Sequence, residues 1–412
     1  MPFRIALSGL NTATTDLEVT GNNIANASTN GFKLSRAEFG DLYANSIQDT
    51  SNNAAGQGAQ VSRVAQQFTQ GSVDFTSNNL DLAISGQGFF VLQNADGTTS
   101  YTRAGAYTVD RDGYVVNHSG DNLQTYPAVA GAGGTTTFNT GVLQDLQLPI
   151  TPSAPNPTGT ISASLNLDSS STAPTTAFDP LDSTSYNDST STTVYDTLGN
   201  AHTATLYFRK TADNTWEGYQ YVDGNSVTAG GSASFPVTFD SAGALATPAG
   251  GTVTMDAYTP SGGGGVLNMS LDFTGTTQYG TDFAVNNLSQ DGYSSGRLAG
   301  VDIDSEGVVF ARYTNGQSSA LGKVAMAKFN NEQGLRQIGD TSWAESFSSG
   351  NVQLGEAGTS SFGQIQSGAL ESSNVDVAEQ LVNLITAQRN FQANAQVIQT
   401  GDQITQAIIN LR

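Results

Sequence analysis

The last forty residues, 373–412, constrain the fold most, because they form a long amphipathic stretch with no neighbouring segment to pack against. Steps of four and three residues alternate along it, which is the spacing of a coiled-coil seam. The seam residues are Val377, Leu381, Leu384, Gln388, Phe391, Ala395 and Ile398. Ser373 followed by Asp376 predicts the helix start. After Gly401 the apolar set shifts by one position to Ile404, Ile408 and Leu411, which predicts a kink or a change of partner.

The other end of the chain carries the matching seam. Pro2 suits a first helical turn, and Asn30-Gly31 predicts the helix end, because glycine adopts positive φ without strain. We expect the two terminal helices to pair. One interpretation is an ordinary helix pair that is stable within one chain. The other is that the seam residues stabilise the pair only marginally, so that it becomes ordered when neighbouring copies cover its outer faces. The N-terminal seam comprises Ala6, Leu10, Ala13, Leu17, Thr20, Ile24 and Ala27.

Charge and composition exclude several classes of partner. The formal net charge is −21, so nucleic acid and anionic membrane surfaces would repel the chain. No apolar run is long enough to span a bilayer, and the first ten residues do not resemble a cleavable signal peptide. The chain has no cysteine, hence no disulfide and no thiolate metal site. That fits a cytosolic protein, or one exported unfolded by a route that forms no disulfides.

Two terminal motifs carry a family resemblance. The run TGNNIANASTNGFK at 20–33 resembles the N-terminal signature of bacterial flagellar rod and hook proteins. The run LESSNVDVAEQLVNLITAQRNFQANAQVIQTGDQI, which begins at Leu370, resembles the C-terminal signature of the same family. Physically, the first motif is a helix exit in which asparagine amides lie near the helix end and Phe32 anchors the chain after the turn.

The middle of the chain reads as β-structure with glycine-marked turns, such as Asp96-Gly97 and Asp110 to Gly113. The runs SGQGFF, YTRAGAY and DRDGYVV resemble the core domain of rod and hook proteins. Proline-rich sequence at 149–157 precedes several short strands, and TTVYDTLGNAHTATLYF there resembles the outer domain of hook proteins, which shorter rod proteins lack.

We therefore expect a mixed α and β, multidomain fold, in which long N- and C-terminal helices form a coiled-coil-like inner domain around nested all-β core and outer domains. The expected parts are a helical inner domain (1–30 and 373–412), a connector (31–71 and 359–372), a split β core (72–149 and 285–358), and an inserted β-barrel or sandwich (150–284).

No constellation of residues supports catalysis or cofactor binding. The two histidines, His118 and His202, stand beside no nucleophile motif. Asp302 to Gly307 begins like a calcium loop, but Tyr313 stands where the last ligand should be, so a hairpin turn is expected. The glycines at 262–265 lack a following Lys-Ser or Lys-Thr and predict a turn. Amides along the last helix predict either a bland surface, contacts between subunits or the lining of a polar channel.

The resemblance implies a non-enzymatic subunit of the flagellar hook, self-assembling into a flexible tube that transmits torque from rod to filament. It implies an extracellular location, export without a cleaved signal, and as partners the distal rod protein, the hook cap, the hook–filament junction protein and the export apparatus, with no cofactor, nucleic acid or membrane insertion. A distal rod protein is the close alternative, and a secreted adhesin or hydrolase is an alternative from another class. The expected assembly interface comprises Leu10, Ala13, Leu17, Asn22, Asn23, Ile24, Asn26, Gly31, Phe32, Leu381, Leu384, Ile385, Phe391, Ala395, Ile398, Ile404 and Ile408.

Overall fold

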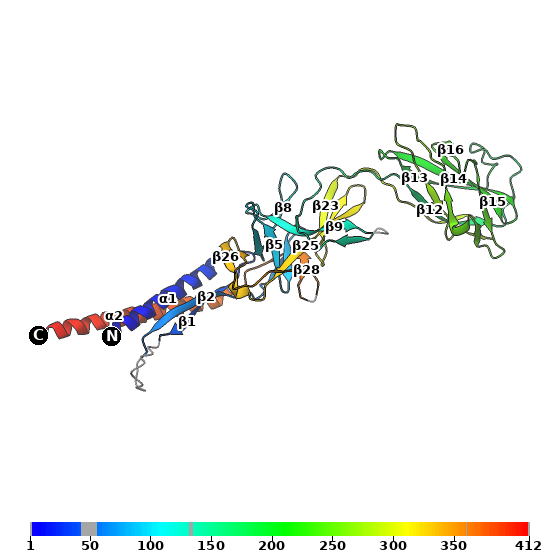
Figure 1. The fold of residues 1–412 in the computed structure, drawn as a ribbon. Helices are drawn as coiled ribbons and strands as arrows, with labels where there is room; N and C mark the ends of the chain where they lie inside the picture. Colours follow the sequence, from blue (N-terminus) through cyan, green and yellow to red (C-terminus); the bar gives the residue numbers. More distant parts are fainter. Residues whose placement is uncertain (1, 43–55, 132–134, 360, 411–412) are drawn as a thin grey trace. The chain divides into compact units, whose positions relative to one another are not determined.

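Two long helices end the chain, and β-strands fill the sequence between them (Figure 1). The structure is a computed structural model that describes residues 2–42, 56–131, 135–359 and 361–410. The helices are α1 (Pro2–Ala25) and α2 (Val377–Asn410). The mixed, nested fold class expected from the sequence is confirmed.

The chain divides into two compact units. Unit 1 comprises Met1–Ile150, Gly300–Arg312 and Ser318–Arg412, and unit 2 comprises Thr151–Ala299 and Tyr313–Gln317. Unit 2 is therefore an insertion into unit 1. The finer division into inner, connector, core and outer parts, with its boundaries at 30, 71, 149, 284, 358 and 372, stays a prediction.

One large sheet forms the body of unit 1, with the main strand order β23-β24-β25-β9-β5-β6-β27-β26. Its aromatic core packs edge to face: Phe89 lies 5.7 Å from Trp343, and Tyr101 lies 4.8 Å from Phe329, between ring centroids. A turn of 3₁₀ helix, η3 (Glu332–Gly334), follows β25. The strands are β5 (Phe89–Gln93), β6 (Thr99–Thr102), β7 (Thr108–Val109), β8 (Val115–Val116), β9 (Asn122–Ala130), β10 (Thr136–Phe138), β11 (Gln144–Asp145), β23 (Leu298–Ile303), β24 (Val308–Tyr313), β25 (Ser318–Lys328), β26 (Arg336–Gly339), β27 (Ser342–Ala344) and β28 (Gln353–Glu356).

Three two-stranded sheets connect this body to the terminal helices. Two of them pair a strand near the N-terminus with one just before α2: β3 (Val73–Phe75) with β30 (Ala369–Glu371), and β4 (Leu82–Ser85) with β29 (Gln364–Ser367). The third is a hairpin of β1 (Ser35–Asp41) and β2 (Ala59–Gln66), which the sequence analysis did not predict. Part of the expected connector at 31–71, residues 43–55, lies outside the described residues.

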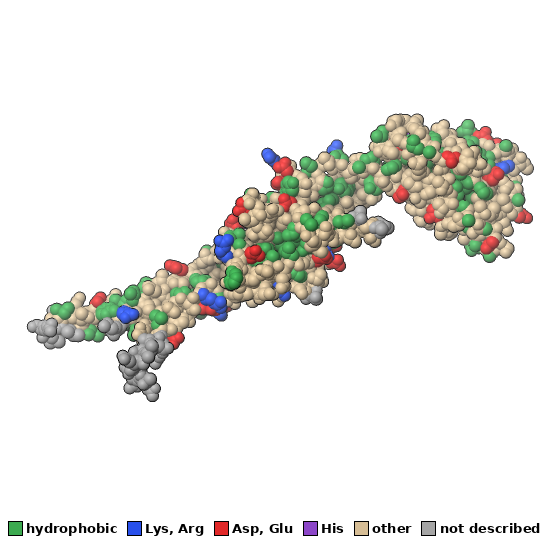
Figure 2. Space-filling view, in the orientation of Figure 1, with side chains coloured by type: hydrophobic (Ala, Val, Ile, Leu, Met, Phe, Trp, Pro, Cys, Tyr) green, Lys and Arg blue, Asp and Glu red, His purple; other side chains and the backbone are tan. Residues whose placement is uncertain are grey.

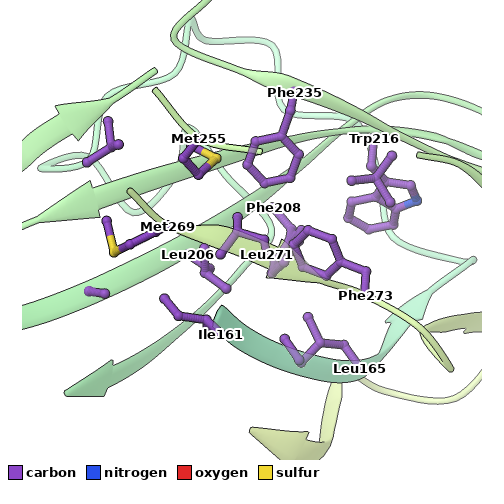
Figure 3. Packing of buried hydrophobic residues seen from close by; sticks show 14 of the residues in the cluster. Ile161, Leu165, Leu206, Phe208, Trp216, Phe235, Met255, Met269, Leu271 and Phe273 are labelled. Atoms are coloured by element: carbon purple, nitrogen blue, oxygen red, sulfur yellow. The ribbon is translucent and has the colours of Figure 1, made fainter. Parts of the chain in front are cut away.

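Unit 2 is a two-sheet sandwich, as the insertion was expected to be a barrel or sandwich. Both sheets contribute to one core, in which Phe208, Trp216 and Phe273 are completely buried (Figure 3). One sheet holds β12 (Thr160–Asp168), β19 (Thr252–Thr254), β20 (Ser270–Asp272), β21 (Thr277–Tyr279) and β22 (Ala284–Gln290). The other holds β13 (Asp188–Tyr195), β14 (Ala201–Ala212), β15 (Thr215–Val222), β16 (Asn225–Val227), β17 (Phe235–Phe239) and β18 (Leu245–Thr247), which is followed by the 3₁₀ turn η2 (Ala249–Gly251).

Both terminal helices are shorter at their inner ends than the sequence analysis predicted. The expected start at Ser373 is wrong: Asp376 is itself the cap, accepting the backbone N–H of Ala378 at 2.8 Å, so the helix begins at Val377. α1 ends at Ala25 because Asn26 donates from its side chain to the carbonyl of Asn22 at 2.9 Å, in competition with the helical pattern.

Two further expectations concern single turns. Helix α2 continues past Gly401 without interruption, so the alternative of a kink is wrong. The Asp302–Gly307 segment is a hairpin turn, in which the Asp304 carboxylate accepts the backbone N–H of Val308 at 2.8 Å and Gly307 has φ 81°. The calcium-loop interpretation was rightly set aside.

Candidate assembly interface

Helices α1 and α2 lie antiparallel against each other. A hydrogen bond of 3.3 Å joins the side chains of Asn23 and Gln380, at the inner end of the pair. At the outer end, a Cβ on Gly401 would lie 2.9 Å from the Phe3 ring. The closest packing therefore depends on residues without bulky side chains, and both chain ends lie at the same end of the pair (Figure 1).

The seam within the chain is built from small and polar residues seven positions apart. On α1 three of the predicted seam residues, Ala6, Ala13 and Thr20, are buried, as is Asn23 near the helix end. Leu10, Leu17 and Ile24 lie half-buried beside them. On α2 the buried positions are Gln380, Ala387 and Gly401, so the seam lies one residue earlier than predicted. Leu384, Phe391, Ala395 and Ile398 flank it half-buried, whereas the predicted members Val377, Leu381 and Gln388 are exposed.

The remaining apolar residues of α2 face away from the seam. Leu381 is 46% exposed and Ile404 is 57% exposed, although both were chosen as candidate interface residues from the sequence. Figure 2 shows apolar side chains at the surface along the terminal helices. Large apolar side chains exposed in both halves of a helix are unusual on an isolated helix pair and are typical of a surface that another chain covers. The other exposed members are Val377, Val382, Ile385, Val397 and Ile409 on α2, and Phe3, Ile5 and Leu7 on α1.

Asn23 fixes the inner end of the helix pair. Its side-chain amide donates to the carbonyl of Ser35 at 2.7 Å, and its oxygen accepts the backbone N–H of Ser35 at 2.9 Å. Since it also bonds Gln380, this one buried side chain joins α1, the start of β1 and α2. Asn374 adds a parallel connection, accepting the backbone N–H of Leu34 at 2.7 Å and donating to the carbonyl of Gln67 at 2.8 Å.

A buried ion triad lies next to this amide network. The Glu371 carboxylate accepts from the Lys33 ammonium at 2.6 Å and from the Arg103 guanidinium at 3.1 Å, and all three side chains are almost fully buried. Lys33 also donates to the carbonyl of Thr69 at 2.8 Å. Burial lowers the pKa of Lys33, and the Glu371 carboxylate acts against that shift. The triad joins the helix exit, the strand before α2 and the large sheet of unit 1.

Gly31 and Phe32 hold the exit of α1 against the body of unit 1. Gly31 has φ 71°, and a Cβ there would lie 2.4 Å from the backbone nitrogen of Ala104. Its own N–H donates to the carbonyl of Glu371 at 2.8 Å, and Phe32 is buried. The left-handed turn predicted at Asn30-Gly31 is confirmed at Gly31, after a short run of turns that follows the helix.

The other sequence-predicted residues divide into two groups. Asn22 is exposed and Asn26 half-buried, and they bond each other near the helix end, where Asn26 also accepts from Thr29 at 3.2 Å. Ile408 belongs to α2, but its side chain lies outside the described residues. None of the candidate residues is tested as an interface between copies, so that role stays a prediction.

Sequence reasoning missed Lys33, Arg103, Asn374 and Gln380 as junction residues. Lys33 and Asn374 do occur within the two quoted motifs, GFK and LESSN. For Lys33 the available signal was a charged residue between two apolar neighbours, Phe32 and Leu34. Arg103 lies within the quoted run YTRAGAY, but nothing there indicates its partner, which is 268 positions away.

The two histidines differ in their surroundings. His202 lies between the carboxylates of Asp223, 2.6 Å from Nδ1, and Asp196, 3.5 Å from Nε2. His118 is exposed. Within the described ranges, no group of three or more histidine or acidic residues is placed to hold a metal ion. Neither α1 nor α2, as far as they are described, is long and apolar enough to cross a membrane.

Comparison with known families agrees with this architecture. Four family models match: flagella basal body rod protein over residues 3–33, the flagellar hook protein FlgE/F/G D1 domain over 83–163, the flagellar basal body protein FlaE D2 domain over 166–293, and flagellar basal body rod FlgEFG protein C-terminal over 366–411. The helix pair, the junction and the inserted sandwich thus define a flagellar protein of the rod and hook class.

Full-length relatives narrow the class. The chain is 40% identical to the flagellar hook protein FlgE of Salmonella typhimurium and to that of Escherichia coli, with all of both chains covered in each case. It is 34% identical to the hook protein of Rhizobium meliloti, over all of this chain and 98% of that one. The chain belongs to the flagellar hook protein family. The crystal structure of the Helicobacter pylori hook protein FlgE2 shares its fold, with a TM-score of 0.52 and 16% identity over 73% of this chain and 100% of that one.

Proposed function

We propose that this chain is the structural subunit of the bacterial flagellar hook, and that many copies assemble into a flexible helical tube that transmits torque from the rod to the filament. The observation that carries this proposal is the exposed apolar surface of α2, to which Leu381, Ile385 and Ile404 contribute. Such a face is stabilised when neighbouring copies pack their terminal helices against it. Because the seam between α1 and α2 uses small residues, the larger apolar side chains of α2 remain free to contact neighbouring copies.

The junction at Glu371 suits a subunit that carries load. Two cations and the backbone N–H of Gly71 converge on one buried carboxylate, which links the helix pair to the large sheet of unit 1. Replacing any member would leave a buried charge without its partner, so the junction resists alternative packings. In the proposed tube, force applied to the helices passes to the sheet through this triad.

The proposal has further parts that rest on the same family membership. The subunit is not an enzyme, it works outside the cell in the hook, and it is exported without a cleaved signal peptide. Its partners are other copies of itself, the distal rod protein, the hook cap, the hook–filament junction protein and the export apparatus. It binds neither nucleic acid nor membrane, as its net charge of −21 favours.

The deciding experiment is hydrogen exchange on purified monomer and on assembled protein. We expect peptides from 2–30 and 373–410 to exchange fast in the monomer and to be protected at least tenfold in the polymer, because neighbouring copies cover the helices. Electron microscopy of the same sample checks for tubes. Equal protection in both samples, or no tubes under any assembly condition, would overturn the proposal.

A further inference from the structure

A polar groove lies on one flank of the helix pair, between α1, α2 and the start of β1. It measures about 250 Å³, and two carboxylates line it, Asp16 from α1 and Glu379 from α2. Arg36 lines it too, but its guanidinium bonds Glu38 at 3.2 Å. Neither groove carboxylate has an ion pair or a hydrogen bond within the described part of the chain. The groove thus offers two free carboxylates to a cation.

A buried hydroxyl beside Asp16 points to a ligand in this groove. Thr20 lines the groove one helical turn after Asp16 and is only 3% exposed. Its hydroxyl has no hydrogen-bond partner among the residues that the structure describes, although buried polar groups are seldom left unpaired. Burial also raises the pKa of the Asp16 carboxyl, as expected for an acid with no cation beside it. A carboxylate and a hydroxyl on adjacent turns are acceptors that suit a guanidinium group.

The outer end of α1 carries a cation that lacks such an acceptor. Arg4 is exposed and has no ion-pair partner in the described ranges. The neighbouring apolar side chains of Phe3, Ile5 and Leu7 are exposed as well. A second copy that covers these apolar residues also removes Arg4 from water, and a desolvated cation is stable only beside a counter-charge. The outer end of α1 therefore requires a carboxylate on the copy that it contacts.

Arg4 cannot reach Asp16 of its own chain. Both belong to α1, twelve residues apart, which is about 18 Å along the helix axis and much longer than an arginine side chain. Arg4 also precedes the buried Ala6 by two residues, about 200° around the helix, so it points away from the seam with α2. A contact between Arg4 and the groove therefore joins two copies.

The spacing of Arg4 and Asp16 fits the growth of a tube. Pairing Arg4 of one copy with Asp16 of the next displaces the two copies by about 18 Å along the helix axis. A contact between different surfaces with such a displacement cannot close into a ring and extends into an open helix.

Arg389, the other cation of α1 and α2, does not fit in this way. It stands almost level with Asp16, because the two lie nine and seven residues from Gln380 and Asn23, which bond each other across the antiparallel pair. Pairing through Arg389 would displace the copies by only about 3 Å, which favours a closed ring.

We propose that Arg4 of one copy binds in the groove of a neighbouring copy, where its guanidinium pairs with the Asp16 carboxylate and donates to the Thr20 hydroxyl. The inference rests on the proposed function, because it requires that copies of this chain assemble. It assigns the polar contact that accompanies burial of the apolar outer end of α1, and it sets the shift between neighbouring copies.

Charge reversal tests this pair in the full-length chain. Arg4→Glu and Asp16→Arg should each raise the critical concentration for assembly by at least about tenfold, because one charge is left in the contact without its partner. The double variant should assemble within about threefold of the unmodified chain, because the pair is restored with its charges exchanged. A general charge effect would not give this pattern, since the two single changes shift the net charge in opposite directions. Glu18→Arg is the matched control: Glu18 is exposed and does not line the groove, so this change should not rescue Arg4→Glu.

Two further measurements separate the contact from folding. Thermal unfolding of the Arg4→Glu monomer should match that of the unmodified monomer, because Arg4 has no partner within the described chain. If Asp16→Arg does not fold, the neutral variants Arg4→Gln and Asp16→Asn replace the reversed ones, and their losses of assembly should not add in the double variant. Additive losses would overturn the proposal, as would a double reversal that assembles no better than the single variants.

Crosslinking locates the contact. The chain has no cysteine, so Arg4→Cys and Asp16→Cys together give a unique pair, about 18 Å apart within one copy and too far apart for a disulfide. Oxidised polymers, or polymers treated with a short bis-maleimide, should yield covalent dimers and longer ladders. Arg389→Cys with Asp16→Cys is the control and should yield none. Ladders from position 389 instead of position 4, or from neither, would overturn the proposal, whereas failure of the unmodified chain to assemble would overturn the proposed function.

Discussion

Glu371 is the residue on which the inner end of this molecule depends. Its two carboxylate oxygens are shared between Lys33, Arg103 and the backbone N–H of Gly71, and its backbone carbonyl accepts from Gly31. A buried carboxylate is tolerated only when its charge is balanced and its lone pairs are satisfied. Here both conditions are met by groups from three separate segments, 31–33, Gly71 and Arg103.

We expect Glu371→Gln to lower the free energy of unfolding by about 3 to 5 kcal/mol, because it leaves two buried cations without their counter-charge. Urea unfolding of the monomer measures this loss. Asp112→Asn is the matched control, since it removes the negative charge of the exposed Arg111–Asp112 pair and should cost less than about 1 kcal/mol. Equal effects of the two variants would contradict the structural role of the triad.

Gly31 leads to a second prediction at this scale. Gly31→Ala forces a side chain into the backbone of Ala104 at a positive φ, and we expect a loss of more than about 2 kcal/mol. Gly21→Ala is its counterpart within α1, where a Cβ meets nothing within 4 Å; it should stabilise the helix by up to about 1 kcal/mol. Thermal unfolding of both variants measures these changes in stability. Gly31→Ala should destabilise the protein and Gly21→Ala should stabilise it, and changes of the same sign would contradict the prediction.

The sequence predicted the conformation at Gly31 but not the partners of Lys33. The Asn30-Gly31 pair predicted the left-handed turn, because only local backbone sterics are involved. The partners of Lys33 could not be predicted, because Glu371 lies 338 positions away and no local pattern encodes that contact. Local signals thus located the turn but not what it packs against.

At the scale of elements, the register of α2 is the informative case. Sequence periodicity favoured the large apolar residues as the seam, but the observed seam uses Gln380, Ala387 and Gly401. Small side chains allow the two helix backbones to approach closely, and this displaces the leucines to the flank and the outer face. Hydrophobic spacing identified both helices and most of the β-core, but it could not tell which apolar face is covered within the chain.

The face of α2 that points away from α1 gives a testable consequence. Leu381→Ser should leave the melting temperature of the monomer within about 2 °C, because the side chain lies outside the intrachain seam. It should raise the critical concentration for assembly by about tenfold, because a buried leucine is lost between copies. Sedimentation of assembled protein measures the second effect. A large loss of monomer stability with normal assembly would place Leu381 in the intrachain seam instead.

At the scale of the whole molecule, the two units carry separate ionisable clusters and one tryptophan each, Trp343 in unit 1 and Trp216 in unit 2. In unit 2, burial disfavours the charged ring of His202, but hydrogen bonds to Asp223 and Asp196 outweigh it and raise the pKa of His202. Burial likewise opposes both carboxylates, but their hydrogen bonds prevail and lower the pKa of Asp196 and of Asp223.

These shifts predict a stability maximum for unit 2. The raised pKa of His202 adds stability below about pH 6.5 that is lost as the pH rises through the folded value, and the lowered pKa values of the two aspartates add stability that is lost as the pH falls below about 4. In a Trp343→Phe background, Trp216 fluorescence reports unit 2 alone. His202→Gln should abolish the alkaline loss; if the loss persists, another group is responsible.

Ionisation of Asp188 destabilises unit 2, whereas ionisation of Asp196 and Asp223 stabilises it. Burial, with a smaller contribution from Asp168, raises the pKa of Asp188 to about 6, and its Oδ2 is buried without a hydrogen bond. Its charged form therefore destabilises unit 2 as the pH rises through 6. Asp188→Asn should stabilise unit 2 by about 1 to 2 kcal/mol at pH 7 and have little effect at pH 4, read from the same fluorescence. Equal effects at both pH values would contradict this cause.

The antiparallel pairing of α1 and α2 also sets an order of events in time. Phe3 packs on Gly401, so the first turn of the chain finds its partner only among the last residues to be made or delivered. Until those residues arrive, α1 can pack only on the β1–β2 sheet, where the backbone N–H of Ala59 donates to Ser8 Oγ at 3.3 Å. Completion of the helix pair thus requires the far end of α2, and a chain cut before Gly401 would lack the contact with Phe3 and would not offer a finished pair to the next copy.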